Sequence, residues 1–185
     1  MTPEAIFQRL QGAFDADTVF DLHADPAKDR DPWFQVAPAR IEQVCERLRD
    51  DPDLRCETME CLTGVDYPSE QKIAVVYHLF SFTQKHRVVL KCFLDRASPK
   101  IPTLVNVWSS ANWQERECFD LLGVHFEGHP DLRRLLLPDD WVGHPLRKDY
   151  KEQDAYHGIP TVRPNPVELF KLRVPGKNEE GPKAS

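Results

Sequence analysis

The sequence contains no apolar run close to the roughly 20 residues that a membrane-spanning helix needs. It also lacks an excess of positive charge, since 24 Lys and Arg stand against 30 Asp and Glu for a net charge of -6. That balance opposes salt-dependent binding to nucleic acid. The stretch before Thr18 mixes acids with a single Arg9, unlike a signal or transit peptide. We therefore expect a cytoplasmic protein that binds no nucleic acid and meets a membrane only through partners.

Cysteine is scarce and irregularly spaced. No two cysteines form a C-x-x-C pair and their number is odd, which favours reduced thiols, and an iron–sulfur cluster needs about four well-placed thiolates. The glycine-rich, Walker and G-x-S-x-G patterns of nucleotide-binding and hydrolytic sites are missing too. We predict no catalytic residue and no flavin, nicotinamide or cluster site in this chain. The five cysteines are Cys45, Cys56, Cys61, Cys92 and Cys118.

Histidine gathers late in the chain without the spacing of a zinc site. No H-E-x-x-H motif is present, and a zinc site wants a closed set of ligands. We predict no metal and expect His129 and His144, each followed by proline, to fix turns. A small metalloenzyme is the alternative that this cluster leaves open. Four of the seven histidines belong to it: His125, His129, His144 and His157.

Hydrophobic periodicity predicts an α+β fold, with helices packed on one side of a mainly antiparallel sheet. The pattern over 72–82 is apolar on both faces, which is typical of a central strand covered on both sides. Helices are expected from Thr2, from Pro38 and from Ala111 to Gly123. In the second of these, one face is apolar and should be buried: Ile41, Val44, Cys45 and Leu48. Strands are expected over 18–22, 33–36, 55–65, 72–82 and 86–94, with a hairpin turn at 83–85 and a further strand or turn at 103–108.

Composition changes after Gly123, where half of the 16 prolines lie. Proline removes a backbone donor, so this part is expected to be neither a regular helix nor a central strand. We predict a core domain over 1–123, an extended proline-rich docking segment over 124–175 and a disordered tail over 176–185.

The helix that begins at Ala111 is rich in charge. Ser110 or Asn112 can cap it, and Glu115 lies where a capping-box acid would fall relative to Asn112. Arg116 and Asp120 are four residues apart and can pair along the helix. The pattern alone favours a solvated helical face for Glu115, Arg116, Glu117 and Asp120.

Two basic pairs follow, Arg133 with Arg134 and Arg147 with Lys148. Apolar residues lie between them, namely Leu135 to Leu137 and Trp141. Arginine and tryptophan among apolar residues are typical of a protein–protein interface. Packing of the leucines on the chain's own domain is the other interpretation, and the pattern does not separate the two.

One stretch resembles a known family. Glu115-Arg116-Glu117 is followed after two residues by Asp120-Leu121-Leu122, after six by His129, after three by Arg133 and after one by Leu135-Leu136. This pattern is similar to the signature of the thirty-kilodalton-type subunit of respiratory complex I. Residues 138–141 and 143–150 resemble the continuation of the same signature.

The resemblance implies a non-catalytic subunit in the peripheral arm of a proton-pumping NADH:quinone oxidoreductase, on the cytoplasmic side of a bacterial inner membrane. Its partners would be the hydrogenase-like large subunit and neighbouring iron–sulfur subunits, while FMN, clusters, NADH and quinone belong to the complex and not to this chain. The same module in a membrane-bound hydrogenase or another complex I relative is the alternative. Interface residues implied are Glu115, Arg116, Glu117, Asp120, His129, Arg133, Arg134, Trp141, His144, Arg147, Lys148 and Tyr150.

Overall fold

The computed structural model describes residues 1–25, 27 and 31–161. The last part of the expected docking segment, 162–175, and the tail expected to be disordered, 176–185, lie outside this range. The chain divides into two units, of which Met1–Tyr150 is the first and the residues from Lys151 on form the second. The first unit thus continues past Gly123, where the sequence placed the end of the core domain.

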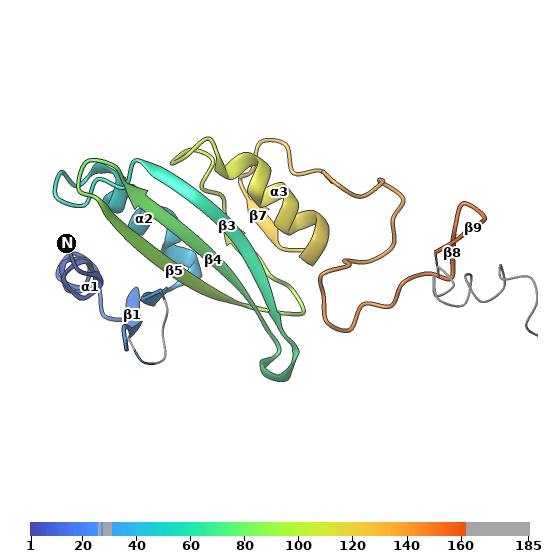
Figure 1. The fold of residues 1–185 in the computed structure, drawn as a ribbon, viewed down its shortest axis with the longest axis horizontal. Helices are drawn as coiled ribbons and strands as arrows, with labels where there is room; N and C mark the ends of the chain where they lie inside the picture. The colour runs from blue at the N-terminus through green and yellow to red at the C-terminus, as the bar shows by residue number, and fades with distance from the viewer. Residues whose placement is uncertain (26, 28–30, 162–185) are drawn as a thin grey trace, which may run out of the picture. The chain divides into compact units, whose positions relative to one another are not determined.

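The described residues of the first unit form an α+β fold, as predicted (Figure 1). Five strands make one sheet in the order β1-β2-β5-β4-β3, in which only the β2–β5 pair is parallel. The helices are α1 (Pro3–Gln11), α2 (Ile41–Asp50) and α3 (Ala111–Leu122). The sheet strands are β1 (Val19–His23), β2 (Trp33–Val36), β3 (Thr58–Tyr67), β4 (Lys72–Ser81) and β5 (His86–Asp95).

The helices cover one face of this sheet. Thr2 caps α1, since its hydroxyl accepts from the Ala5 amide and proline occupies the first turn. The predicted apolar stripe of α2 is buried and packs with alternate residues of β4 and β5 in one core. In Figure 1, α2 lies behind the sheet and α3 lies beside β3. The buried stripe of α2 consists of Ile41, Val44, Cys45 and Leu48.

The opposite face of β4 differs from the prediction that the strand is covered on both sides. Val76 and Ala74 are buried there, yet neither belongs to the core that the three helices share. Phe93 of β5 lies opposite Ala74, and its ring centroid is 5.9 Å from that of Tyr67. Farther along this face, His78 and Val89 line a pocket together with Met1, Pro3 and Pro32, so segments outside the sheet also contribute to it.

A second, parallel pair was missed by the sequence reasoning. β6 (Lys100–Pro102) pairs with β7 (His125–Glu127), so the chain forms a short strand directly after Gly123. Residues 103–108, predicted as a strand or a turn, form a turn. Three-residue strands carry too little periodicity to be recognised from sequence. In the second unit, β8 (Ala155–Tyr156) and β9 (Ile159–Pro160) form an antiparallel pair.

Two 3-10 turns complete the first unit, over Pro38–Arg40 and Pro68–Glu70. Because the turn over Pro38–Arg40 is 3-10, the helix predicted from Pro38 becomes α-helical only at Ile41. Among the described residues, no helix is both long and apolar enough to cross a membrane.

Close packing between α3 and β3 depends on Gly64. A Cβ atom at this position would clash with Cδ1 of Leu122, a side chain that is itself buried. We predict that Gly64→Val destabilises the protein by about 2 kcal/mol, because the added methyl groups overpack this contact. Thr63→Val, at the exposed neighbouring position, is the control and should change the urea midpoint little. Equal midpoints for the two variants would show that α3 does not press on β3 at Gly64.

Candidate functional site

The outer edge of β3 is covered by side chains at the start of α3. β3 ends the sheet on this side, so its outward backbone groups need partners. The Trp108 indole donates to the Cys56 carbonyl (3.1 Å) and the Ser110 hydroxyl to the Met59 carbonyl (3.4 Å). The Gln114 amide oxygen accepts from the Leu62 amide. Ser110 is therefore engaged with β3 and, contrary to expectation, its side chain does not cap α3.

Glu115 is not the capping-box acid that the sequence suggested. Its carboxyl group is buried, accepting from the Thr103 hydroxyl (2.5 Å) and the Leu104 amide (2.6 Å). The helix already begins at Ala111, so Asn112 lies inside it and cannot be the cap. Burial raises the pKa of Glu115 to about 7, although the bonds from Leu104 and Thr103 favour the charged form.

Asp120 is the centre of the site. Its side chain is fully buried, and one carboxylate oxygen accepts the amides of three successive leucines, at 3.0, 2.7 and 2.8 Å for Leu135, Leu136 and Leu137. The other oxygen accepts from Nη1 of Arg134 at 2.8 Å. Burial alone would raise the pKa of Asp120, but the three amides and Arg134 outweigh it and hold the pKa below its ordinary value. We call residues 129–150 the wrapping segment, because these bonds fold it over α3.

Arg116 holds the same segment from the opposite direction. Its guanidinium donates to the carbonyls of Arg133 and Arg134, both at 3.2 Å, and it is buried. The predicted pair between Arg116 and Asp120 is thus wrong, since each reaches the wrapping segment instead. The solvated-face prediction is also wrong for Glu115, Arg116 and Asp120, and it holds only for Glu117, which is exposed.

The last turn of α3 is closed by the end of the wrapping segment. Gly123 ends the helix with φ +77°, as predicted, and a Cβ there would lie 2.6 Å from Nε2 of His144. Nδ1 of His144 lies 2.9 Å from the Asp120 carbonyl, and Nε of Arg147 donates to the Leu122 carbonyl at 2.8 Å. These contacts satisfy carbonyls that a helix C-terminus otherwise leaves unpaired.

His129 and His144 both contact the main chain of α3 through a ring nitrogen, and His129 also holds its own turn. Nδ1 of His129 accepts from the Asp131 amide at 3.0 Å, so Nε2 carries the proton that it donates to the Asn112 carbonyl at 3.1 Å. The part of the chain that the structure describes contains no group of three or more His, Cys, Asp or Glu residues placed to hold a metal ion.

A second anchor was not found by sequence reasoning. Arg96 makes a two-pronged bond to buried Asp66, at 2.7 and 3.0 Å, and also reaches Asp149 at 2.6 Å. Asp66 in turn accepts the amide of Lys148 at 2.8 Å, and the bonds from Arg96 and Lys148 keep its pKa low. Asp66 and Arg96 lie 30 residues apart, so no local pattern reveals them.

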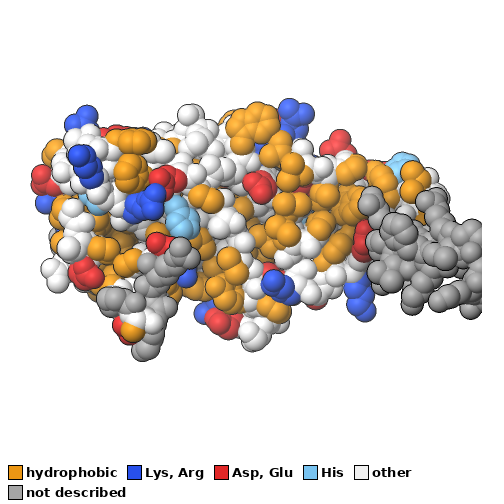
Figure 2. Space-filling model, viewed as in Figure 1, with side chains coloured by type: hydrophobic (Ala, Val, Ile, Leu, Met, Phe, Trp, Pro, Cys, Tyr) orange, Lys and Arg blue, Asp and Glu red, His pale blue; other side chains and the backbone are white. Residues whose placement is uncertain are grey.

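The wrapping segment leaves several apolar side chains in solvent. Hydrophobic side chains gather in Figure 2 over the region where α3 lies in Figure 1. A shallow groove between β3 and α3 continues this surface and is lined in part by Gly64, Glu117 and Leu121. The exposed fractions are 61% for Trp113, 62% for Leu136, 67% for Val142 and 54% for Leu146. We call these four residues the apolar surface.

The remaining predicted interface residues divide by exposure. Arg134 turns inward to Asp120 and to the Trp141 carbonyl (3.0 Å), while the Trp141 indole donates to the Tyr150 hydroxyl at 3.1 Å. Arg133 is 72% exposed and pairs with Asp131 at 2.9 Å, and Lys148 is also exposed. Glu115, Arg116 and Asp120 are buried within the chain, whereas the exposed members and the half-buried ones remain open to contact with a neighbouring protein.

Comparison with known proteins identifies this arrangement. The family described as "Respiratory-chain NADH dehydrogenase, 30 Kd subunit" matches residues 34–156, which include most of the sheet, α3 and the whole wrapping segment. The chain belongs to this family. The resemblance noted in the sequence is confirmed.

Individual relatives support the family and the fold. A protein named as the C subunit of NADH-quinone oxidoreductase, from Chloroherpeton thalassium, is 45% identical over 145 residues, which cover 77% of this chain and 59% of the relative. A solved trypsin-resistant fragment of Nqo5 is similar with a TM-score of 0.56, at 25% identity over 69% of this chain and 99% of the fragment. A chain of an archaeal membrane-bound sulfane sulfur reductase has the same fold, with a TM-score of 0.65, at 22% identity over 96% of this chain and 95% of that chain.

Removing the charge of Asp120 tests the centre of the site. We predict that Asp120→Asn lowers the free energy of unfolding by roughly 3 kcal/mol, because Arg134 and three amides lose a buried anionic partner. Glu117→Gln, on the exposed side of the same helix, should stay within about 0.5 kcal/mol of wild type. Urea unfolding at pH 7 measures both, and equal stabilities would show that Asp120 does not hold the wrapping segment.

The stabilities of wild type and Asp120→Asn should depend differently on pH. Because the fold holds the pKa of Asp120 below its ordinary value, its contribution is present above about pH 4 and is lost as pH falls through the lower, folded value. The stability gap between wild type and Asp120→Asn is therefore predicted to shrink on acidification. A gap that stays constant from about pH 7 to about pH 2.5 would contradict this assignment.

Proposed function

We propose that this chain is a docking subunit without a catalytic site of its own, in the peripheral arm of a proton-pumping NADH:quinone oxidoreductase (complex I). The observation that carries the proposal is the wrapping segment itself. Buried Asp120 and Arg116 fix the segment on α3, and Trp113, Leu136 and Val142 remain exposed beside them. Exposed apolar side chains on a rigid scaffold favour association with another protein.

The chemistry of the charged residues supports a structural role. Asp120 has three amides and a guanidinium as partners, and Asp66 has Arg96 and the Lys148 amide. Carboxylates held in this way are kept ionised, which suits a clamp more than a group that exchanges protons with a substrate. In this proposal the charged residues of α3 do not themselves contact the partner. They hold the wrapping segment in place, and the exposed apolar side chains make the contact.

The partners in this proposal are the hydrogenase-like large subunit that lines the quinone cavity and the neighbouring iron–sulfur subunits. FMN, clusters, NADH and quinone would be bound by other members of the complex. The complex would lie at the cytoplasmic side of a bacterial inner membrane, and this chain would reach the membrane only through it. The names of the relatives motivate this choice, and the apolar surface is the part of the chain on which the large subunit would bind.

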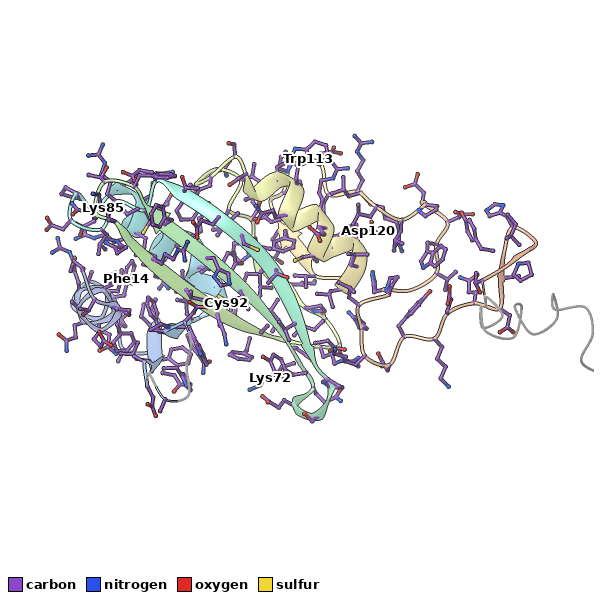
Figure 3. All side chains as sticks on the ribbon, viewed as in Figure 1. Phe14, Lys72, Lys85, Cys92, Trp113 and Asp120 are labelled. Carbon is purple, nitrogen blue, oxygen red and sulfur yellow. The ribbon has the colours of Figure 1, made fainter. Side chains whose placement is uncertain are left out.

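Trp113 is the residue that tests the docking proposal. Figure 3 labels it on the same helix as Asp120, and its side chain is 61% exposed. We predict that Trp113→Ala lowers the stability of the isolated chain by no more than about 1 kcal/mol, the scale of its cation–π contact with Arg116 (5.0 Å), but weakens binding to the large subunit roughly 30-fold, the scale of an aromatic hot spot. Titration of labelled chain with purified large subunit gives the affinity.

Phe82→Ala provides the matched control, since Phe82 is 64% exposed but lies beside the β4–β5 turn that Lys85 marks in Figure 3. It should bind as wild type does. An unchanged affinity for Trp113→Ala would mean that the apolar surface is not the docking surface. Recovery of the tagged chain from its host without NADH-oxidising subunits, but with a hydrogenase-type catalytic subunit, would replace complex I by a relative in this proposal.

A further inference from the structure

The cover that α3 gives to the outer edge of β3 stops at Leu62. In an antiparallel pair, alternate residues of an edge strand direct both N–H and C=O away from the neighbouring strand. The Leu62 amide donates to Gln114, so Leu62 is one of these outward residues. The pairing of β3 with β4 continues without a bulge from Leu62 to Gly64. The backbone N–H and C=O of Gly64 therefore point outward as well.

No hydrogen bond among the described residues occupies these outward groups of Gly64, or the Leu62 carbonyl beside them. Gly64 is half-buried and exposed residues flank it, so another molecule can reach the edge. Proteins usually block an open strand edge with a charge, a proline or a bulge. From Thr63 to Val65 the strand has none of these, and its bulge lies earlier, between Met59 and Cys61.

The shallow groove between β3 and α3 lies beside this edge. Its lining includes Gly64, the apolar side chains of Leu121 and Leu146, and one acid, Glu117. Leu146 also belongs to the apolar surface, so the groove continues that surface. Glu117 is exposed and makes no ion pair within the described part of the chain. The groove thus offers apolar contacts and one negative charge next to unpaired backbone.

These features favour an extended, basic segment of a different protein. Only another extended main chain offers donors and acceptors at the spacing of a strand edge. A helix could fill the groove, but its own backbone groups are paired internally and would leave Gly64 unsatisfied. A second copy of this chain is disfavoured, because each copy carries a net charge of -6.

We propose that the edge of β3 at Gly64 takes up an extended segment of the large subunit, which adds to the sheet as a further strand. The main chain of the segment accepts from the Gly64 amide and donates to the outward carbonyls. Its apolar side chains face Leu121 and Leu146, and a lysine or arginine lies next to Glu117. In strand addition of this kind, main-chain bonds supply affinity and alternate side chains supply specificity. The inference rests on the proposed function, which makes the large subunit the source of the segment.

Hydrogen exchange of the Gly64 amide tests the pairing directly, in the full chain alone and in its complex with purified large subunit. We expect fast exchange in the chain alone and exchange slowed at least roughly 100-fold in the complex. The Leu62 amide, already bound by Gln114, is the internal control and should exchange slowly in both. A Gly64 amide that exchanges equally fast in the complex would overturn the proposal.

Protection of the Gly64 amide in the chain alone would overturn the proposal too. Protection that is the same at every protein concentration would assign the edge to the chain's own residues beyond Thr161. Protection that grows with concentration would assign it to a second copy.

A backbone variant removes the donor without adding an atom. Glycolic acid in place of Gly64 turns the amide N–H into an ester oxygen and should weaken binding to the large subunit roughly fivefold, the scale of one hydrogen bond. The same replacement at Gly128, exposed in the turn after β7, is the matched control and should bind as wild type does. Unfolding midpoints of both variants separate lost affinity from lost fold. An unchanged affinity for the Gly64 variant would contradict the pairing.

Glu117→Lys tests the predicted cation of the segment. We expect binding to weaken roughly tenfold at low salt and less at high salt, since opposite charges are replaced by like ones. Glu46→Lys, at an exposed position of α2, changes the net charge equally and should bind as wild type does. Equal losses for the two variants would overturn the contact at Glu117.

The outcomes separate this inference from the docking proposal. If Trp113→Ala weakens binding while the Gly64 amide stays unprotected in the complex, docking stands and strand addition fails. If the Gly64 amide is protected while Trp113→Ala binds as wild type does, strand addition stands and the apolar surface is not the docking surface.

Discussion

The structure of the first unit depends on one buried negative charge. Asp120 gathers three consecutive backbone amides and one guanidinium of the wrapping segment. A carboxylate in a core is unfavourable unless donors surround it, so charge and segment require each other. Arg116 donates to the carbonyls of Arg133 and Arg134 in the same stretch. Because Asp120 binds amides and Arg116 binds carbonyls, the two residues together fix the orientation of the segment on α3. Proline-rich chain with few hydrogen bonds of its own becomes ordered on α3 by these interactions.

The need to satisfy the buried charge of Asp120 explains why some charged residues of the family motif point inward and others are exposed. The inward members, Glu115, Arg116 and Asp120, satisfy backbone and side-chain groups within the chain. The apolar surface and exposed cations such as Arg133 lie outside the clamp, where a partner can reach them. A signature rich in charged residues can therefore serve to fix the shape of a docking surface. Docking through that shape is the function we propose for this member of the thirty-kilodalton subunit family.

Sequence reasoning succeeded where structure repeats locally. The buried stripe of α2, the bounds of β2 and the end of α3 at Gly123 followed from periodicity and from a residue that tolerates positive φ. It failed where partners are distant. The donors to Asp120 lie 14 to 17 residues further on, and a helical pair with Arg116 was an equally good local solution. Only the resemblance to a family indicated that the residues of α3 and of the wrapping segment act together.

The clamp can be tested through the amides that it binds. Hydrogen exchange of Leu135, Leu136 and Leu137, measured at neutral pH in the full chain, reports directly on the bonds to Asp120. These three residues lie outside any helix or strand, so only those bonds protect their amides. Our account predicts that they exchange as slowly as the amides of the middle of α3. Exchange at the rate of an open loop would contradict it, and would mean that the wrapping segment is not held on the helix in solution.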